Sequence, residues 1–288
     1  MKPLSTPKLE AWIERVLLIA TALSAVAIVS ILVLLSAFCL PLFTTHRLGD
    51  VLSWVWQPFG GKFGILPMVA GSLALSLVSL AMAFPVALGL CALLTVYARH
   101  TLSRILGGVV LFMTGIPTVV YGFVSVFLLV PRIRDGFGAG TGYSLLAASI
   151  TLGILIVPTL VLVMQAGLQR IDPMLRLSAE ALGLTPIQQM RHVFLPAASR
   201  SIAIAALLGF GRAVGDPLIS LMLAGNAAQV PHSFLASFRT LPAHISLVVA
   251  TDSQSMAYQS VFAAGLILFV LTGGISMIIG VRRERNGR

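Results

Sequence analysis

The stretch FGILPMVAGSLALSLVSLAMAFPVALGLCALLTVYA, residues 63–98, decides the fold because it is apolar almost throughout and contains no Asp, Glu, Lys or Arg. A helix that crosses a membrane needs about 20 predominantly apolar residues, and this stretch exceeds that length. Four more charge-free stretches lie between Arg15 and Arg47, Arg104 and Arg132, Asp135 and Arg170, and Asp252 and Arg282. Segment 201–224 is also apolar, interrupted only by Arg212 and Asp216. The sequence therefore predicts an all-α integral membrane protein with about six transmembrane helices.

The composition of the whole chain agrees with this prediction. Hydrophobic residues make up 58% of the 288 residues, charged residues make up 10%, and the mean hydropathy is +1.00. A soluble domain carries about 25% charged residues. A soluble fold is therefore excluded.

The net charge of +10 would suggest a nucleic-acid partner in a soluble chain, but here the distribution of the basic residues matters more. If the N-terminus is cytoplasmic, 13 of the 19 basic residues lie on the cytoplasmic side, namely Lys2, Lys8, Arg15, Arg99, Arg104, Arg170, Arg176, Arg191, Arg200, Arg282, Arg283, Arg285 and Arg288. This bias follows the positive-inside rule. We expect a multi-pass protein of the inner (plasma) membrane that contacts lipid, has both termini in the cytoplasm and binds no nucleic acid.

The predicted spans divide the chain into three parts. Residues 1–64 comprise a cytoplasmic tail, the first span and an outer loop, residues 65–281 form a transmembrane core, and residues 282–288 form a basic cytoplasmic tail. The apolar run 16–40 is too long for the apolar region of a cleaved signal peptide, which favours a retained span. Another single span is expected near 105–130.

Prolines and glycines interrupt several of these spans. Each proline removes a backbone hydrogen bond and tends to kink its helix, and ordinary bending and the lining of a transport pathway explain them equally well. Gly211 and Gly215 are four residues apart, a spacing that permits close helix packing. The prolines inside predicted spans are Pro85, Pro117, Pro158 and Pro217.

A polar stretch, about 169–200, separates two spans and has the pattern of two short helices. Asp172 is expected to cap the first helix and Gly183 to end it in a left-handed conformation. Thr185 is expected to cap the second helix, with Gln188 completing a capping box, and Pro196 to stop it. A cytoplasmic docking surface and an amphipathic helix pair on the bilayer explain this pattern equally well.

The segment LSAEALGLTPIQQMRHVFLP, Leu177 to Pro196, resembles the EAA loop of ABC importer permeases. Gly183, Leu195 and Pro196 match the family pattern, whereas Leu177-Ser178-Ala179 stands where the family usually has Glu-Ala-Ala. The nearest acid is Glu180. The resemblance implies a type I ABC importer permease fold, in which this loop is the coupling helix that docks on the nucleotide-binding subunit.

Three further segments resemble the permeases of phosphate-specific ABC importers. They are GIPTVVYG (115–122), GRAVGD (211–216), with Asp216 where that family usually has Glu, and the tripeptide 240–242. The resemblance implies a substrate pathway along the residues Pro117, Thr118, Tyr121, Arg212 and Asp216.

Arg212 has the chemistry that an anion pathway needs. A buried arginine is costly in a membrane, and its planar fork of donors suits phosphate oxygens. Asp216, at i+4, is expected to pair with Arg212 while the site is empty. A purely structural ion pair is the alternative explanation of the same two residues.

The chain contains no G-x-x-x-x-G-K-[ST] motif, so ATP hydrolysis must be supplied by another subunit. We expect a transport subunit that is not an enzyme, binds no metal or cofactor, and relies on ATP and Mg bound by its partner. The resemblance implies three partners: an ABC ATPase dimer, a second permease that is either identical or different, and an extracytoplasmic phosphate-binding protein. The alternatives are a permease for another oxyanion (molybdate, tungstate or phosphonate) and a secondary transporter or channel that needs no ATPase.

Overall fold

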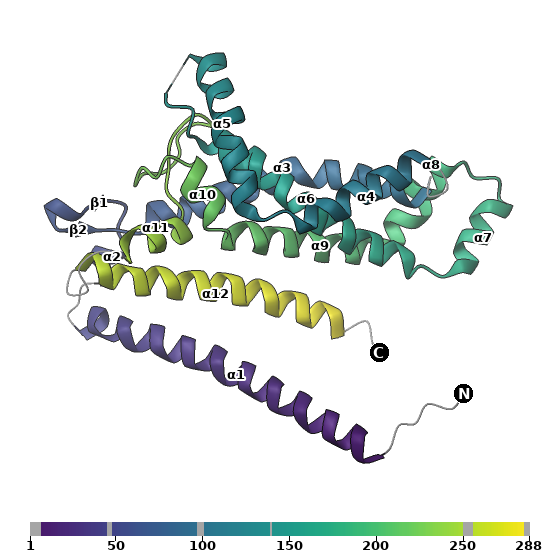
Figure 1. The fold of residues 1–288 in the computed structure, drawn as a ribbon, viewed down its shortest axis with the longest axis horizontal. Coiled ribbons are helices and arrows are strands. Elements are labelled where there is room, and N and C mark those ends of the chain that lie inside the picture. The colour runs from purple at the N-terminus through teal and green to yellow at the C-terminus, as the bar shows by residue number, and fades with distance from the viewer. Residues whose placement is uncertain (1–6, 45–47, 97–100, 139, 250–255, 285–288) are drawn as a thin grey trace.

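A computed structural model describes residues 7–44, 48–96, 101–138, 140–249 and 256–284. Helices make up nearly all of its regular structure (Figure 1). The elements are α1 (Pro7–Thr44), α2 (Leu48–Val51), β1 (Trp56–Gln57), the 3-10 helix η1 (Pro58–Gly60), β2 (Lys62–Phe63), α3 (Leu66–Val96), α4 (Thr101–Gly115), α5 (Thr118–Phe137), α6 (Leu145–Gln169), α7 (Pro173–Ala181), α8 (Pro186–Gln189), the π-helix η2 (Met190–Phe194), α9 (Leu195–Gly215), α10 (Leu218–Leu223), α11 (Leu241–Val248) and α12 (Met256–Glu284).

The prediction of about six spans is confirmed. Within the described ranges, five helical segments are long and apolar enough to cross a membrane, and the bent pair α4–α5 makes a sixth when it is counted as one span. The five are α1, α3, α6, the continuous run Pro186–Gly215, and α12.

The expected single span near 105–130 is wrong in one respect, because it is broken. Helices α4 and α5 meet at an angle of 101°, and Figure 1 shows α5 turning away from the line of α4. Pro117 stands at the break in an extended conformation, with φ −60° and ψ 142°. Proline disfavours the helical conformation in the residue before it and donates no hydrogen bond to the preceding turn, so α4 ends and α5 begins anew.

Helices α3, α6 and α9 form the core of the bundle, and the largely buried α6 packs against both of the others. Small residues let these helices approach closely. A Cβ on Gly209 would lie 2.6 Å from Leu160 Cδ2, and a Cβ on Gly153 would lie 3.4 Å from the backbone oxygen of Ser79. Membrane helices associate largely through such packing, because lipid supplies no hydrophobic driving force between them.

Gly211 and Gly215 do not serve this close packing. A Cβ on Gly211 would make an ordinary 3.5 Å contact with Ile275 of α12, and a Cβ on Gly215 would meet no atom within 4 Å. Of these three glycines of α9, it is therefore Gly209, outside the spacing noted in the sequence, that permits a close approach between helices.

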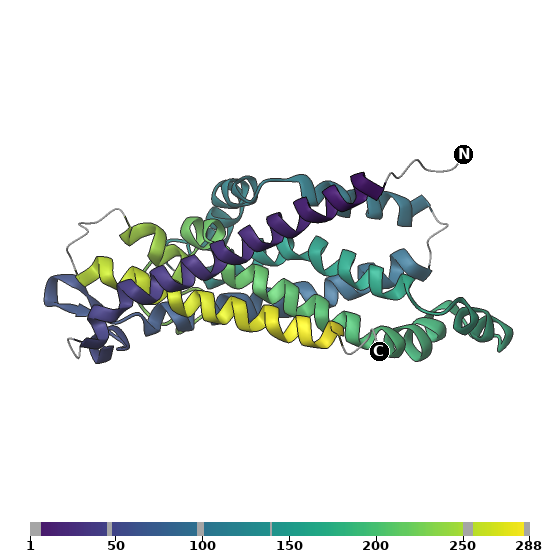
Figure 2. The same ribbon diagram turned by 90° about the horizontal axis from the view of Figure 1, so that it is seen from below.

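Helices α1 and α12 lie side by side along one flank of the bundle (Figures 1 and 2). Phe38 of α1 stacks on Phe262 of α12 with ring centroids 4.5 Å apart. Most of α1 is exposed in the single chain, as expected of a helix that faces lipid.

Short elements close one end of the bundle. The loop after α1 contains α2 and a hairpin in which Trp56 pairs with Phe63, and Gly61 occupies the left-handed region at φ +70° in its turn. The predicted span 201–224 is also interrupted here. Helix α9 ends at Gly215 and α10 begins at Leu218, because Pro217 cannot donate the backbone hydrogen bond that would continue α9.

Helices α7 and α8 lie at the opposite end, where the start of α1 and the end of α12 also lie (Figure 2). The caps predicted for this segment are confirmed. Asp172 accepts a hydrogen bond from the Met174 N–H, and Thr185 and Gln188 form a reciprocal capping box. Gly183 has φ +67°.

The prediction that Pro196 stops the second helix is wrong. The chain remains helical from Pro186 to Gly215, passing through the π-helical turn η2 just before Pro196. In that turn the Leu195 N–H bonds to the carbonyl oxygen of Met190, five residues back. The wider turn changes the hydrogen-bond register ahead of the proline, so Pro196 lies in the first turn of α9 and the helix continues.

Candidate functional site

Arg212 lies in the last turn of α9 and reaches across to α6. Its Nη1 donates a hydrogen bond to Thr159 Oγ1 at 2.7 Å. The arginine side chain is exposed in the single chain although α9 belongs to a membrane-spanning segment. An arginine at mid-bilayer costs about 2.5–3.5 kcal/mol on insertion scales. The exposed face of Arg212 is therefore suited to a water-filled cavity or a partner subunit rather than to lipid.

The expected ion pair between Arg212 and Asp216 is not formed, although both residues lie in the described part of the chain. Asp216 has an extended backbone, with φ −80° and ψ 114°, so the helical i,i+4 geometry ends before it. Its Oδ1 accepts a hydrogen bond from the Ile219 N–H at 2.8 Å. The carboxylate thus stabilises the first turn of α10 and leaves the guanidinium of Arg212 available.

The predicted pathway residues of the GIPTVVYG segment lie at the break between α4 and α5. Pro117 is exposed, Thr118 begins α5 and is partly buried, and Tyr121 Oη donates a hydrogen bond to the Met113 carbonyl at 3.0 Å. This bond joins the two helices across the bend. The phenol of Tyr121 also lies within electrostatic range of Arg212.

The structure thus brings α5, α6 and α9 together around Arg212. Helix α5 also packs against α10, since a Cβ on Gly122 would lie 2.6 Å from Met222 Sδ. In the described residues, no hydrogen bond links Pro117 or Thr118 to Arg212.

Sequence reasoning missed Thr159. The residue is one of the few polar groups in the span 145–169 and directly follows Pro158, which gives a weak signal. Its partner Arg212 is 53 positions away along the chain, so only the packing of α6 against α9 reveals the contact.

A second candidate surface is formed by α7, α8 and the turn between them. Several apolar side chains are largely exposed there, among them Met174 at 65%, Leu177 at 59%, Leu182 at 78% and Ile187 at 69%. An exposed apolar cluster at the end of a bundle is typical of a protein docking site.

The three residues at the EAA position and the neighbouring Glu180 face different ways. Ala179 is buried at 3% exposure, whereas Leu177, Ser178 and Glu180 are exposed. Glu180 helps to line a small polar pocket together with Arg176, whose guanidinium lies over the Phe194 ring at 5.2 Å from its centroid. This cation–π contact attaches α7 to the π-helical turn and so to α9.

The two remaining residues of the EAA-type pattern, Leu195 and Pro196, lie where α8 and η2 join α9. Leu195 is partly buried and Pro196 is exposed, both in the first turn of α9. A displacement of α7 and α8 therefore acts on a helix that is continuous as far as Gly215, the end at which Arg212 lies.

Comparison with known proteins decides the family. The profile of the binding-protein-dependent transport system inner membrane component family matches residues 85–283. The chain belongs to this family. It is therefore a permease component of an ABC importer and a multi-pass protein of the inner membrane.

Curated relatives match most of this permease. It is 34% identical over 220 residues to the "Probable ABC transporter permease protein YqgH" of Bacillus subtilis (strain 168), covering 75% of this chain and 71% of that protein. It is 27% identical over 277 residues to the "Phosphate transport system permease protein PstC" of Mesorhizobium japonicum, covering 87% and 85%. Several of the relatives compared are named as phosphate transport system permeases, at 25–27% identity.

Solved structures share the fold. A chain of the MetNI methionine ABC transporter, in an inward-facing conformation, aligns with a TM-score of 0.60 at 22% identity, covering 80% of this permease and 99% of that chain. A chain of a bacterial ABC transporter involved in the import of alginate aligns with a TM-score of 0.58 at 16% identity, covering 96% and 99%. The type I ABC importer permease fold predicted from the sequence is confirmed.

Proposed function

We propose that this permease translocates inorganic phosphate across the inner membrane. The observation that carries the proposal is Arg212, a permanently charged fork of donors on an exposed face of a spanning helix, of which one donor is held by Thr159. Guanidinium groups bind phosphate oxygens through paired, charge-assisted hydrogen bonds. The names of several relatives, as phosphate transport system permeases, support the same solute.

Three neighbours of Arg212 then have distinct roles. Thr159 positions the guanidinium, because its hydroxyl fixes one terminal nitrogen and leaves the other donors for the anion. Asp216 is held by the α10 backbone, so its carboxylate does not occupy the hydrogen-bond donors of Arg212. Tyr121 adds a hydroxyl within range of the same charge, and Pro117 and Thr118 set the bend that brings it there.

The working complex requires partners. An ABC ATPase dimer docks on α7 and α8, using ATP and Mg that this chain does not bind, and the exposed apolar side chains of that surface support this contact. A second permease, identical or different, covers the face that exposes Arg212, since a charge facing lipid is costly. An extracytoplasmic binding protein delivers the phosphate at the end that contains α2 and the hairpin.

The proposed orientation has both termini in the cytoplasm. Helix α1 begins, and α12 ends, at the same end of the bundle as α7 and α8 (Figure 1). The bias of basic residues toward that end supports a cytoplasmic placement.

A permease for another oxyanion, such as molybdate, tungstate or phosphonate, would use Arg212 in the same way. A guanidinium offers similar donors to any tetrahedral oxyanion. Competition in an uptake assay separates these solutes. The oxyanion that the permease transports should block uptake of the labelled solute at a concentration comparable to it, and the others should not.

The direct test is uptake of radioactive phosphate by cells without their own high-affinity system, with the permease expressed beside its candidate partners. We expect Arg212→Ala to lower uptake about 100-fold, because the proposed contact between Arg212 and phosphate is closed off from water in the assembled complex, and truncating one member of such a charged contact costs about 2–5 kcal/mol. Arg212→Lys should retain part of the activity, since it keeps the charge and loses the fork. Arg134→Ala is the matched control, because Arg134 is exposed and pairs only with its neighbour Asp135 among the described residues.

Normal uptake by a correctly inserted Arg212→Ala variant would contradict the role of Arg212. Uptake of molybdate but not phosphate would move the assignment to that oxyanion. Transport by the purified permease alone in liposomes would favour the alternative of a secondary transporter or channel.

A further inference from the structure

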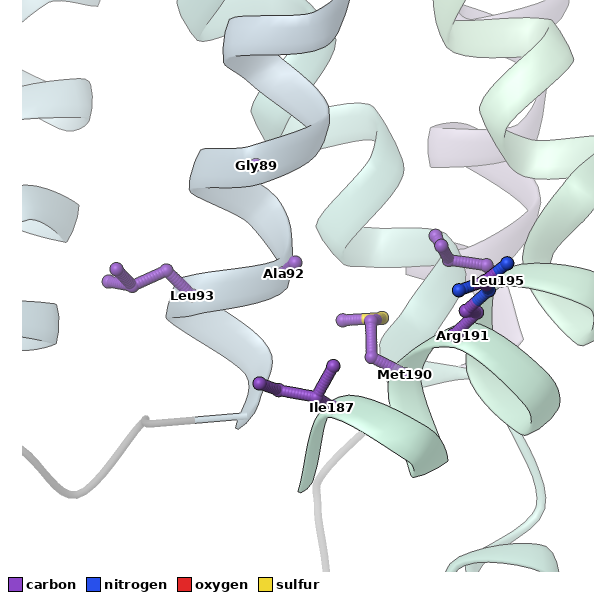
Figure 3. Close-up of a pocket in the computed structure, with 7 residues that line it drawn as sticks. All are labelled: Gly89, Ala92, Leu93, Ile187, Met190, Arg191 and Leu195. Carbon is purple, nitrogen blue, oxygen red and sulfur yellow. The ribbon is translucent and has the colours of Figure 1, made fainter. Parts of the chain in front are cut away.

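An apolar cavity of about 410 Å³ lies between the end of α3 and the α8–η2 segment. Figure 3 shows Ile187 and Met190 pointing from α8 and η2 toward α3, where Ala92 faces them. Its volume falls within the range of about 300–1,000 Å³ that is usual for small-molecule sites. The lining residues are Gly89, Ala92, Leu93, Ile187, Met190, Arg191 and Leu195, and Arg191 alone among them carries a charge.

Both walls of the cavity belong to membrane-spanning segments. Gly89, Ala92 and Leu93 lie in the last two turns of the span 66–95, and the opposite wall begins the span 186–215. The cavity is therefore at the level of one membrane surface, on the side of α7 and α8. An apolar cavity at that level lies within reach of lipid acyl chains.

Arg191 gives the cavity a positive rim. Its side chain is exposed, and no hydrogen-bond or ion-pair partner for it is found among the described residues. Arg104, Arg170 and Arg176 add positive charge at the same end of the bundle. A basic group beside an apolar cavity at the cytoplasmic membrane surface complements an anionic lipid headgroup with its acyl chain.

We propose that this cavity binds an anionic phospholipid of the leaflet on the α7–α8 side, with an acyl chain against Met190 and Ala92 and the phosphate at Arg191. The proposal goes beyond the transported solute and does not depend on it. Ile187 and Met190 belong to the helix that continues from the coupling loop into α9, so a bound lipid braces that helix against α3. Membrane composition would then influence how motion of α7 and α8 reaches the span.

A substitution at Gly89 can be used to fill the cavity. Gly89 lines the cavity, and a Cβ on it would meet no atom within 4 Å, so Gly89→Leu adds bulk at the cavity wall without a clash at its Cβ. Gly108→Leu is its matched control, because Gly108 also has nothing within 4 Å and lies on α4, outside the cavity. To test the role of the positive charge, Arg191→Gln is compared with Arg104→Gln. Arg104 is an exposed arginine at the same end of the bundle.

The experiment measures phosphatidylglycerol retained on the purified full-length permease by native mass spectrometry, with phosphatidylcholine as the zwitterionic probe. Gly89→Leu should lower retention of both lipids, and Gly108→Leu should leave both unchanged. Arg191→Gln should weaken phosphatidylglycerol binding about fivefold, since one basic residue near a membrane contributes about that factor, and should weaken phosphatidylcholine binding less, because the choline cation offsets its phosphate. Arg104→Gln should have no effect at this site.

Unchanged phosphatidylglycerol retention by a folded Gly89→Leu variant would overturn the proposal. If that variant also failed to assemble with its second permease or its ATPase, the cavity would be assigned to a protein interface instead. Because the readout is lipid retention, a failure of phosphate uptake leaves this result unaffected.

Discussion

Gly71 lies in the second turn of α3, where this helix passes against the loop that precedes α11. A Cβ at this position would run into the backbone oxygen of Arg239 and lie 2.9 Å from the buried ring of Phe238. A backbone atom cannot yield as a flexible side chain can, so the helix and the loop must separate. The need for glycine at position 71 thus arises from a segment almost 170 residues away in the sequence.

We expect Gly71→Ala to destabilise the permease by about 1–3 kcal/mol, the usual cost of overpacking. Gly89→Ala, on the same helix, is the matched control. It enters open space and replaces a helical glycine, which should stabilise the helix by up to about 1 kcal/mol. Thermal unfolding in detergent measures both variants, and equal melting temperatures would contradict the tight contact between α3 and the loop.

His244 provides a pH-dependent prediction at the same scale. It lies on α11, outside the spanning helices, fully buried, with Nε2 3.1 Å from Ser260 Oγ and its ring edge-on to Trp56. Burial, and then the positive charge of Arg239, lower the pKa of His244 to about 3. The unfolded chain binds the proton near pH 6.5, whereas the folded chain does not. Stability is therefore full above pH 6.5 and is lost as the pH falls toward 3.

The loss should approach about 1.4 kcal/mol per pH unit within that window. His244→Gln should remove this slope, because glutamine does not titrate. His192→Gln, a change at an exposed histidine of η2, should preserve it. Melting temperatures between pH 7 and pH 4.5 test this (about two units of the window), and a wild-type slope that persists in His244→Gln would assign the effect to other groups.

At the scale of elements, features that depend on neighbouring residues can be predicted from the sequence, whereas features that depend on distant packing cannot. The caps at Asp172 and Thr185 depend on backbone groups within three residues, so the sequence contains all the information needed to place them. Prolines depend on their surroundings. Pro117 breaks its span by 101°, whereas the helix continues through Pro158 and past Pro196.

The difference between these prolines has a physical cause. At position 196 the preceding π-helical turn alters the hydrogen-bond register, so the missing N–H falls in a first turn and costs little. At position 117 no such turn precedes the proline, and α5 packs against α10 in its new direction. The sequence contains each proline but not the packing that decides its effect.

The cap of α7 yields the prediction at this scale. Asp172→Ala removes the acceptor of the Met174 N–H, which lies 2.8 Å from Asp172 Oδ1, and an N-cap is worth about 1 kcal/mol. Amide hydrogen exchange in Pro173–Ala181 should become roughly fivefold faster, while α6 stays unchanged. Ser178→Ala is the control in the same helix, because the Ser178 hydroxyl bonds only to the preceding turn. Equal exchange in the two variants would mean that contacts such as Arg176 with Phe194, rather than the cap, hold α7.

At the scale of the whole molecule, one continuous helix connects the two candidate sites, the α7–α8 surface and Arg212. The helix from Pro186 to Gly215 begins beside the exposed apolar surface of α7 and α8 and ends at Arg212. Helix α6 lies against much of its length and holds Thr159 opposite Arg212. Movement of α7 and α8 thus has a continuous path to Arg212, and the exposed face of Arg212 fits the proposed contact with a second permease.

The orientation of this unit in the membrane gives the last prediction. Cys39 and Cys91 are buried and free, so single cysteines introduced at exposed positions can be labelled over a low background. In cells whose outer membrane is permeabilised and whose inner membrane is intact, a membrane-impermeant maleimide should label Phe59→Cys. Phe59 lies in η1, between the two strands of the hairpin, and is fully exposed. The maleimide should reach Leu182→Cys, on the turn after α7, only after the inner membrane is permeabilised. Labelling of Leu182→Cys while the inner membrane is intact would reverse the orientation and move the ATPase contact away from α7 and α8, because ATP is hydrolysed in the cytoplasm.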